Sequence, residues 1–335
     1  MKKKSTEILY DYDESEGEFY DEPFGVLYNK AKTKLVKAPS YITEYSVLSS
    51  TKVICDRAFE DCKLLSHIVL PVGLEHIGIS AFSGCEKLIS LKLPDSVKSL
   101  GFFFVFAGMK SLTTIQFSKG LTSIPATAFH ECNNLANIVI PENITTIEPR
   151  AFYKCESLET ISIPDSLTEI KNGAFAGCAA IKEFKLSKNH PVFRWKNGIL
   201  INQPKNKLLY YSPLKTEKHY KAPKYITEID DMAFGLCSHL ETVYFPDSVT
   251  VLESGAFARC VNLKSIRLSK KLKTINDQTF RHCESLTSIV IPKSVEYIGS
   301  LAFENCYELR EVVIRNPDAT FGRNLFAGCE NQIIK

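Results

Sequence analysis

The sequence predicts a β-rich solenoid of about eleven 23-residue rungs, each with a short helical or 3₁₀ turn, plus two β-hairpin modules. One observation behind this prediction is a phrase, Ala-Phe-x-x-Cys, that occurs in eleven near-identical copies; Val105, Thr279 and Leu325 replace alanine in three of them, and Met109 replaces cysteine in one. Another is a constant period, because consecutive phenylalanines lie 23 residues apart except for one step of 24 and one gap of 59. Such a period outweighs the two domains that a length of 335 residues favours. The phenylalanines are Phe59, Phe82, Phe106, Phe129, Phe152, Phe175, Phe234, Phe257, Phe280, Phe303 and Phe326.

The composition excludes several classes of protein. With 44% hydrophobic and 24% charged residues, the chain is neither intrinsically disordered nor collagen-like. Its longest uncharged apolar stretch, Ser99 to Met109, is too short for a membrane helix, so we expect no membrane insertion. A net charge of +3 is too small to indicate a nucleic-acid partner.

Residues 1–24 form the first element in the chain. They hold three lysines against eight acidic residues, and Asp11, Asp13 and Glu14 interrupt any apolar run. This pattern predicts an acidic, disordered tail and no secretory signal peptide.

Residues 25–52 are expected to form an N-terminal hairpin cap. Two apolar runs, Gly25–Asn29 and Lys34–Lys37, read as strands joined by a turn, and Ala38-Pro39 follows them. A solenoid needs such a cap to cover the apolar edge of its first rung.

Residues 53–185 form the first block of rungs. In one clear copy, Leu158, Ile161 and Ile163 alternate as a short half-buried strand, which Pro164 ends. No unit of this size buries its apolar face alone, so the units must stack, with phenylalanine as the core residue. Burial of each phenylalanine contributes roughly 1.5–3 kcal/mol.

The cysteines occupy one position of the repeat, which indicates a structural role. At a fixed offset from phenylalanine they are expected to face inward as free thiols, and Met109 fits the same apolar position. Cys55 lies outside the phrase, where Gly78 and Gly299 occur in other rungs. We therefore expect Cys55 to be the most exposed cysteine.

Residues 186–225 are expected to form a basic β-hairpin insert, in which Asn197–Asn202 and Lys207–Tyr211 read as two strands joined by a turn. From Lys182 to Lys224 the chain has ten lysines and Arg194 against two glutamates, and Arg194, Trp195 and Lys196 form a basic and aromatic cluster. This cluster is a candidate contact for an acidic partner protein. In the alternative interpretation, Trp195 packs the hairpin on its neighbouring rung and the lysines are simply solvated.

Residues 226–335 form the second block of rungs. Exposed strand positions here and in the first block are of mixed types, without a row of acids or aromatics. Tyr244 and Arg267, one rung apart, are the candidate partner-binding pair by residue type. The valines at the other positions reflect strand propensity.

The rungs, read as A-F-x-x-C-x-x-L-x-x-I-x-I-P-x-S-V-x-x-I, resemble the leucine-rich repeats of the BspA type, a family of bacterial surface proteins that also occurs in protists. The resemblance covers about residues 53–329 and implies a curved leucine-rich-repeat solenoid with one strand per rung on its concave sheet. It implies binding to proteins or host matrix and a surface or secreted location. Since a signal peptide is not recognised, either a native leader is missing or the protein acts inside the cell.

These observations favour a non-enzymatic scaffold that binds another protein through the concave sheet and the hairpin insert. The alternative is an adhesin that binds host matrix or other cells. Nucleophile elbows, phosphate-binding loops and zinc motifs do not occur in the sequence, so we expect no catalytic residue, metal or cofactor. The sequence leaves the oligomeric state open.

Overall fold

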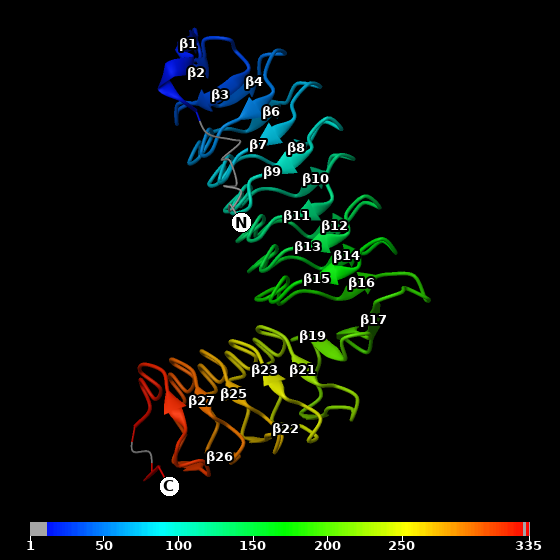
Figure 1. Ribbon diagram of the computed structural model, residues 1–335, viewed down its shortest axis with the longest axis vertical. Helices are drawn as coiled ribbons and strands as arrows, with labels where there is room; N and C mark the ends of the chain where they lie inside the picture. The colour runs from blue at the N-terminus through cyan, green and yellow to red at the C-terminus, as the bar shows by residue number, and fades with distance from the viewer. Residues whose placement is uncertain (1–11, 331–332, 335) are drawn as a thin grey trace, which may run out of the picture. The chain divides into compact units, whose positions relative to one another are not determined.

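The computed structural model describes residues 12–330 and 333–334 and divides into two compact units, Met1–Ala174 (unit 1) and Phe175–Lys335 (unit 2). Each unit is a stack of similar rungs (Figure 1). The fold is the predicted β-solenoid, and the boundary between the units lies just before the hairpin insert, which belongs to unit 2.

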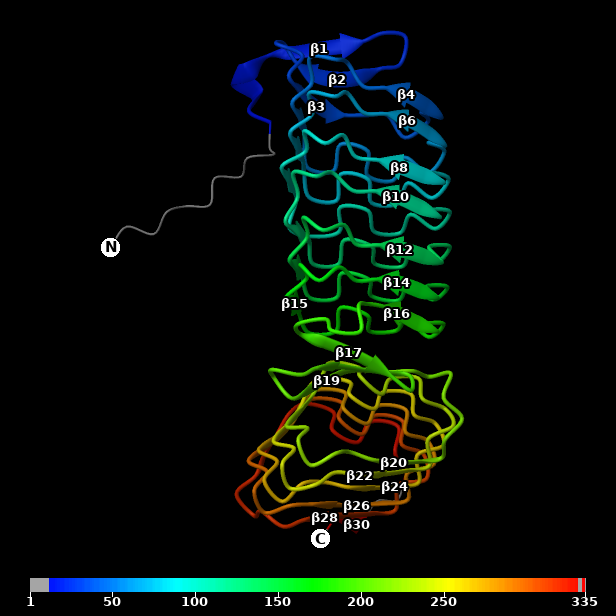
Figure 2. The same ribbon diagram turned by 90° about the vertical axis from the view of Figure 1, so that its right-hand side faces the viewer.

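One strand of each rung forms what we call the long-strand side. Thirteen described strands lie on this side. Eleven belong to rungs with the phenylalanine phrase, and the other two, one in each hairpin module, belong to rungs without it. Figure 2 shows them stacked in parallel in unit 1. In unit 1 they are β4 (Glu44–Ser46), β6 (His67–Val69), β8 (Ser90–Lys92), β10 (Thr114–Gln116), β12 (Asn137–Val139) and β14 (Thr160–Ser162). In unit 2 they are β16 (Glu183–Lys185), β20 (His219–Lys221), β22 (Thr242–Tyr244), β24 (Ser265–Arg267), β26 (Ser288–Ile291), β28 (Glu311–Ile314) and β30 (Ile333–Ile334).

Two-residue strands form a second ladder, the short-strand side. In unit 1 they are β5 (Val53–Ile54), β7 (His76–Ile77), β9 (Ser99–Leu100), β11 (Ser123–Ile124), β13 (Thr146–Ile147) and β15 (Glu169–Ile170). In unit 2 they are β21 (Glu228–Ile229), β23 (Val251–Leu252), β25 (Thr274–Ile275), β27 (Tyr297–Ile298) and β29 (Thr320–Phe321). Their partners are the strands of the adjacent rungs, in parallel register, except that β9 and β11 do not pair with each other.

Each Ala-Phe segment forms two consecutive β-turns. In the first such rung, the Ala58 N–H donates to the Cys55 carbonyl at 3.2 Å and the Cys62 N–H donates to the Phe59 carbonyl at 3.0 Å. The third residue of each turn, Arg57 and Asp61, has a φ of 58°, as in type II turns. β-Turns therefore replace the predicted helical or 3₁₀ turns, because a left-handed residue prevents a right-handed helix from continuing.

The predicted phenylalanine core is confirmed in both units. Within each unit, neighbouring rings stack with centroids 4.9–6.1 Å apart and interplanar angles of 4–27°. The N–H of Phe129 donates to the carbonyl of Ala151 in the next rung at 2.8 Å, and Phe257 donates to Thr279 in the same way. The turns thus approach as closely as strands do, which explains the small residue beside each phenylalanine.

The cysteine column faces inward as predicted, and the structure assigns it a partner. Eight of the ten thiols of this column donate to the carbonyl of the aromatic residue one rung earlier, for example Cys155 to Phe129 at 3.0 Å and Cys260 to Phe234 at 2.9 Å, whereas Cys62 donates to the Pro39 carbonyl of the cap at 3.6 Å. All eleven cysteines are free thiols, and ten are buried.

The prediction for Cys55 is wrong, because its side chain is only 2% exposed and Cys329 is the more exposed cysteine. Its N–H donates to the Leu35 carbonyl of the N-terminal cap at 2.9 Å, so the cap covers this position. At Gly78, one rung later, a Cβ atom would collide with Cys55 and Asp56.

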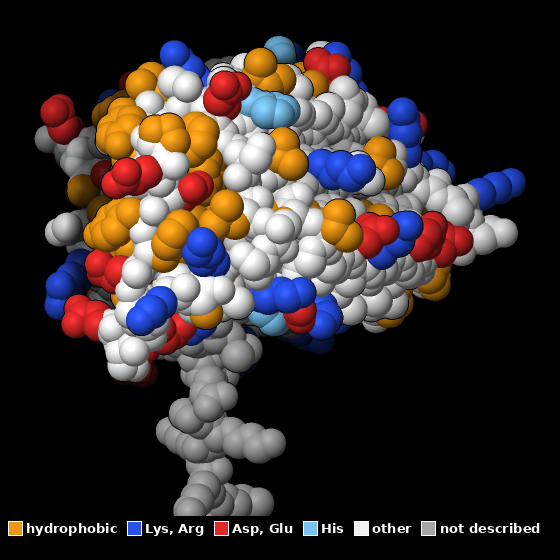
Figure 3. Space-filling model, turned by 90° about the horizontal axis from the view of Figure 1, so that it is seen from above, with side chains coloured by type: hydrophobic (Ala, Val, Ile, Leu, Met, Phe, Trp, Pro, Cys, Tyr) orange, Lys and Arg blue, Asp and Glu red, His pale blue; other side chains and the backbone are white. Residues whose placement is uncertain are grey.

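The N-terminal cap begins earlier than predicted. Residues 1–11 of the expected disordered tail lie outside the described residues, but a 3₁₀ helix, η1 (Glu14–Glu16), and strand β1 (Glu18–Asp21) follow them. β1 pairs with β2 (Val26–Asn29), which pairs with β3 (Lys34–Lys37), so the acidic segment adds a third strand to the predicted hairpin. Seen from this end, the molecule mixes hydrophobic and charged side chains (Figure 3).

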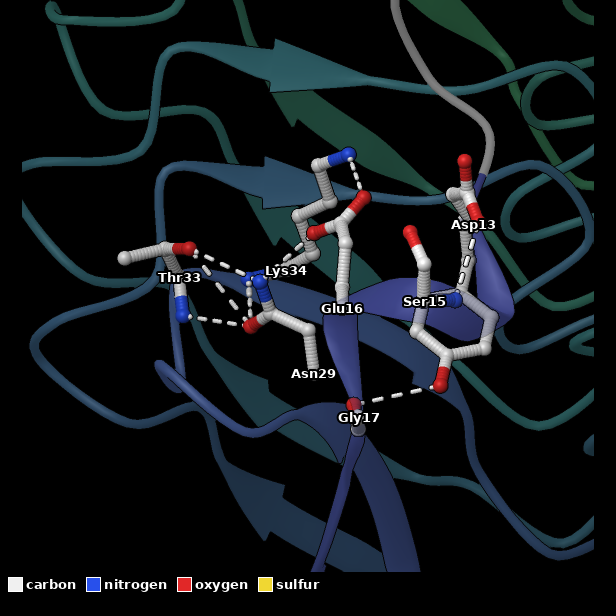
Figure 4. Close-up of polar contacts among 8 residues, drawn as sticks. Asp13, Ser15, Glu16, Gly17, Asn29, Thr33 and Lys34 are labelled. Atoms are coloured by element: carbon white, nitrogen blue, oxygen red, sulfur yellow. Dashed lines mark hydrogen bonds and ion pairs between the residues drawn. The ribbon is translucent and has the colours of Figure 1, made fainter.

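Asn29 holds the turn of this cap together. Its Nδ2 donates to Glu16 at 2.9 Å, and its Oδ1 accepts the backbone N–H groups of Thr33 and Lys34 at 2.8 and 2.9 Å (Figure 4). Lys34 also forms an ion pair with Glu16. These contacts explain why an acidic segment without apolar alternation still forms regular structure.

The hairpin insert repeats this architecture. β17 (Phe193–Lys196), β18 (Ile199–Asn202) and β19 (Lys207–Tyr211) form an antiparallel meander, and β19 continues in parallel into β21. The predicted strands 197–202 and 207–211 correspond to β18 and β19, whereas β17 was not predicted. Leu208 and Tyr211 belong to the core of unit 2, so the insert is an integral part of the solenoid.

Candidate protein-binding face

Side chains alternate on the long-strand side. The middle residue of each three-residue strand points into the core, for example Ile161 and Val243, which are at most 3% exposed. The first and third residues face outward, as the alternation in the sequence predicts. In unit 2 the third positions hold Lys185, Lys221, Tyr244, Arg267, Val290 and Val313.

The structure brings the predicted pair Tyr244 and Arg267 together. The two residues are register partners on β22 and β24, and the Arg267 guanidinium carbon lies 4.4 Å from the centroid of the Tyr244 ring. On the other side, Lys221 of β20 places its Nζ 5.3 Å from the same centroid. The ring, 37% exposed, therefore lies between two cations, an arrangement that cation–π attraction stabilises.

A cavity of about 360 Å³ lies beside Arg267. Its lining includes apolar residues of β24 and β26, among them the buried Ile266 and the exposed Val290, and the cations Arg267, Lys270 and Arg315. An apolar floor with a charged rim is typical of a binding site for an amphipathic group.

Some cations of unit 2 form ion pairs and others do not. Lys218 and Lys264 both pair with Glu241 at 2.8 Å, and Arg281 pairs with Glu304. Within residues 12–330 and 333–334, the side chains of the four cations of this face, Lys221, Arg267, Lys270 and Arg315, form no ion pair, as is also true of Lys271 and Lys293 elsewhere in unit 2. An incoming carboxylate would meet no competing acid on these four side chains.

The insert residues Arg194, Trp195 and Lys196 lie on β17, away from this pair, and no contact joins them to Tyr244 or Arg267 in the described structure. Trp195 is half-buried, and its ring packs on Phe184 of β16 with centroids 5.1 Å apart. The Arg194 guanidinium donates to the backbone carbonyls of His190 and Phe193, and Lys196 is exposed.

A second cavity, of about 530 Å³, lies beside Trp195. Glu183 and Lys185 of β16 line it together with Lys188, Arg194 and Trp195. Trp195 thus packs on its neighbouring rung, as one interpretation of this cluster expects. It also borders a basic cavity, which is compatible with the other interpretation, a contact for an acidic partner.

Sequence reasoning missed three residues of the site, Lys221, Lys270 and Arg315. Lys221 precedes Tyr244 by one 23-residue period, but its rung lacks the Ala-Phe-x-x-Cys phrase and was read as part of the insert. Extending the period backward from Tyr244 would have found it. Lys270 and Arg315 follow their strands, and the sequence carries no signal that they border one cavity.

Metal-ligand clusters and membrane-spanning helices are two other features that bear on function. Within the part of the chain that the structure describes, no three His, Cys, Asp or Glu side chains are grouped so as to hold a metal ion. The same residues contain no helix of the length and apolarity needed to cross a membrane.

The fold is similar to several solved structures. A leucine rich cell surface protein from Faecalibacterium prausnitzii matches with a TM-score of 0.70 and 24% identity, over 91% of this chain and 94% of that one. The pneumococcal vaccine antigen PcpA matches with a TM-score of 0.63 and 21% identity, over 90% and 72%. A leucine-rich repeat protein from Eubacterium ventriosum matches with a TM-score of 0.54 and 19% identity, over 86% and 83%. At these identities the similarity establishes the fold alone.

The family assignment comes from the sequence repeat itself. None of the curated proteins matches the chain. The family model described as BspA type leucine rich repeat region matches in six copies, over residues 37–124, 102–195 and 206–333. Together with the stacked rungs and their phenylalanine core, this match shows that the chain belongs to the BspA-type leucine-rich-repeat family.

Proposed function

We propose that this protein is a non-enzymatic scaffold that binds another protein through the long-strand side of unit 2, around Tyr244 and Arg267. The observation that carries this proposal is the exposed Tyr244 ring between two cations without carboxylate partners. Tyrosine and arginine are the residue types that contribute most to protein interfaces, and here one sheet holds them in fixed register. The basic surface of the insert, at Arg194, Trp195 and Lys196, provides a second contact.

The test is site-specific photocrosslinking in cells of the source organism. A photoreactive phenylalanine analogue replaces Tyr244 in one variant and Lys196 in another. Val139, in the equivalent position of unit 1 and 68% exposed, is the matched control. We expect crosslinks to one protein from the positions 244 and 196, and none from 139. Crosslinks from all three positions alike, or from 139 alone, would contradict the proposal.

Point variants are preferable to removal of the insert. β19 pairs with β21, and Leu208 and Tyr211 are buried in the core of unit 2. Deleting 190–220 would therefore unfold the adjacent rungs and abolish binding for a trivial reason. Arg267→Ala leaves this core intact and is expected to remove the crosslink from position 196.

The second candidate function is that of an adhesin that binds host matrix or other cells from the cell surface. The observation that favours it is the similarity to a protein described as a leucine rich cell surface protein. Antibody labelling of intact cells tests it. Labelling only after permeabilisation would exclude an adhesin and leave the protein-binding scaffold standing.

A further inference from the structure

The long-strand side of unit 2 is interrupted between β24 and β26. β20, β22 and β24 form one hydrogen-bonded sheet and β26, β28 and β30 another, with no ladder bond between them in the described structure. The cavity of about 360 Å³ lies at this interruption, because residues 265–270 and 288–292 provide most of its lining. The short-strand side of the same rungs stays paired, so the opening is confined to one side.

The lining of the cavity combines apolar residues with positively charged ones. Val290, which is 45% exposed, and Pro292 provide apolar surface above the buried Ile266 and Ile289, and Arg267, Lys270 and Arg315 provide three positive charges. No acidic residue is among the lining residues. Two acids lie near the lining residues: Glu311, at the first position of β28 and opposite Ser288, and Asp247, whose carboxylate accepts the backbone N–H of Lys270 at 3.0 Å.

We propose that this cavity binds an extended segment of a partner protein in which a pair of large apolar residues, one of which enters the cavity, is flanked by aspartate or glutamate. The inference rests on the proposed function and narrows it to one partner chemistry. The apolar side chain enters the cavity, and the flanking carboxylates meet Arg267, Lys270 and Arg315. A guanidinium suits this role because it binds a carboxylate through two parallel hydrogen bonds.

The cavity is large enough to hold one large apolar side chain. Binding sites for drug-sized ligands span roughly 300–1,000 Å³, and about 360 Å³ lies at the lower end. The row of Lys221, Tyr244 and Arg267 continues the basic surface along the strands' stacking direction. An extended acidic segment that leaves the cavity in this direction would meet the Tyr244 ring and then Lys221.

The test measures binding of a fluorescent octapeptide, DEDLFDED, to the full chain by fluorescence polarisation. We expect saturable binding, and Arg267→Gln and Arg315→Gln should each weaken it about tenfold, the loss expected for one charged hydrogen bond. Lys264→Gln and Lys273→Gln are the matched controls, because each removes one charge that is already paired with a glutamate. Both controls should bind within about twofold of the wild type.

Two further peptides separate the proposal from general polyanion binding. NQNLFNQN lacks the charges and DEDSSDED lacks the apolar pair, and both should bind at least about tenfold more weakly. Equal binding of DEDLFDED and DEDSSDED, or no saturable binding of DEDLFDED, would overturn the proposal. A crosslinked partner from position 244 whose binding is unchanged by Arg315→Gln would overturn this inference and leave the proposed function standing. Absence of that crosslink would contradict the proposed function itself.

Discussion

Units 1 and 2 are built from the same rung but present different surfaces on the long-strand side. In unit 1 the third strand positions hold one cation, and the remaining residues are small, neutral or apolar; they are Ser46, Val69, Lys92, Gln116, Val139 and Ser162. In unit 2 the equivalent column holds Lys221, Tyr244 and Arg267 in succession. The core is therefore common to both units, and the outward positions decide what each unit can bind.

The short-strand side differs between the units in the continuity of its sheet. In unit 2 eight strands, from β17 to β29, form one continuous sheet. In unit 1 the sheet that begins at β1 ends at β9, and a new one begins at β11. The interruption coincides with the single 24-residue rung, whose extra residue falls within Phe102, Phe103 and Phe104, all three exposed. Between these two rungs a single-residue bridge, Phe103 with Ala126, takes the place of the ladder.

The largest expected effect tests what the units share. Phe129→Ala in unit 1 and Phe257→Ala in unit 2 each remove a fully buried ring between two stacked neighbours. Each variant should lose about 3–5 kcal/mol of unfolding free energy. Because each rung contacts only its neighbours, hydrogen exchange should accelerate around the mutated rung alone. Mass spectrometry of exchanging peptides measures this.

The two phenylalanine variants are controls for each other. Faster exchange in unit 1 caused by Phe257→Ala would mean that the solenoid opens as one cooperative body. That result would contradict the nearest-neighbour description of its stability.

A deletion tests the contrast on the short-strand side. Removing Phe103 restores a 23-residue rung, so β9 and β11 should pair, as β11 pairs with β13. Two added backbone hydrogen bonds should stabilise unit 1 by about 1–2 kcal/mol and slow exchange of the β11 amides. Phe103→Ser, which keeps the length, is the control and should change stability by less than about 0.5 kcal/mol. Equal exchange in the deletion and the substitution would show that the extra residue does not cause the break.

Much of the fold could be predicted because the same pattern of residues occurs eleven times in the sequence. The phenylalanine core, the inward cysteines and the outward strand positions all follow from periodicity. The β-turns could not be predicted in the same way, because residues as different as Arg57, Asp61 and Gly84 adopt the left-handed conformation there. The strand β1 also escaped prediction, since it is stabilised by pairing with β2 and by contacts of the preceding Glu16 with Asn29 and Lys34, which lie beyond this acidic segment.

The candidate site could be predicted only in part. Tyr244 and Arg267 follow from their position in the period, but their contact depends on register. The number of unpaired positive charges on the face depends on which lysines form an ion pair with a glutamate of the adjacent rung. Lys264 finds Glu241, and Lys270 finds no acid for its side chain in the described structure. Such pairing is a property of the stacked rungs and has no signature in a single repeat.

Thiol reactivity provides a smaller effect that again separates the units. Burial raises the pKa of Cys132 in unit 1 to about 12, whereas the neighbouring Cys306 thiol lowers the pKa of the half-buried Cys329 in unit 2. Since the thiolate is the reactive form, the native protein should show one fast-reacting thiol with Ellman's reagent at neutral pH. Cys329→Ser should abolish it, and denaturation should release all the remaining thiols. A fast reaction at Cys55 would restore the expectation from sequence and contradict its burial.

The smallest expected effect comes from the charge ladders on the flanks of the two units. Glu241 lies between Lys218 and Lys264, whose hydrogen bonds lower its pKa to about 2. In unit 1, Glu75 lies between Lys52 and Lys98, and its pKa is also lowered, chiefly by Lys98. Because the pKa of each glutamate is lower in the folded than in the unfolded protein, its stabilisation is complete above the unfolded value of about 4.3 and is lost as the pH falls.

Glu241→Gln and Glu75→Gln should therefore lower the melting temperature slightly at neutral pH and low salt. The difference from wild type should shrink in about 1 M salt, where exposed charges are screened, and on acidification below about pH 4. Glu241 has two close lysine contacts at 2.8 Å, whereas the Glu75 contacts measure 2.6 and 3.7 Å, so the unit 2 variant should lose more. Calorimetry across pH measures both. If the melting temperature of the variants stays below that of the wild type in high salt, these glutamates act through packing. That result would contradict the interpretation that their charges link adjacent rungs.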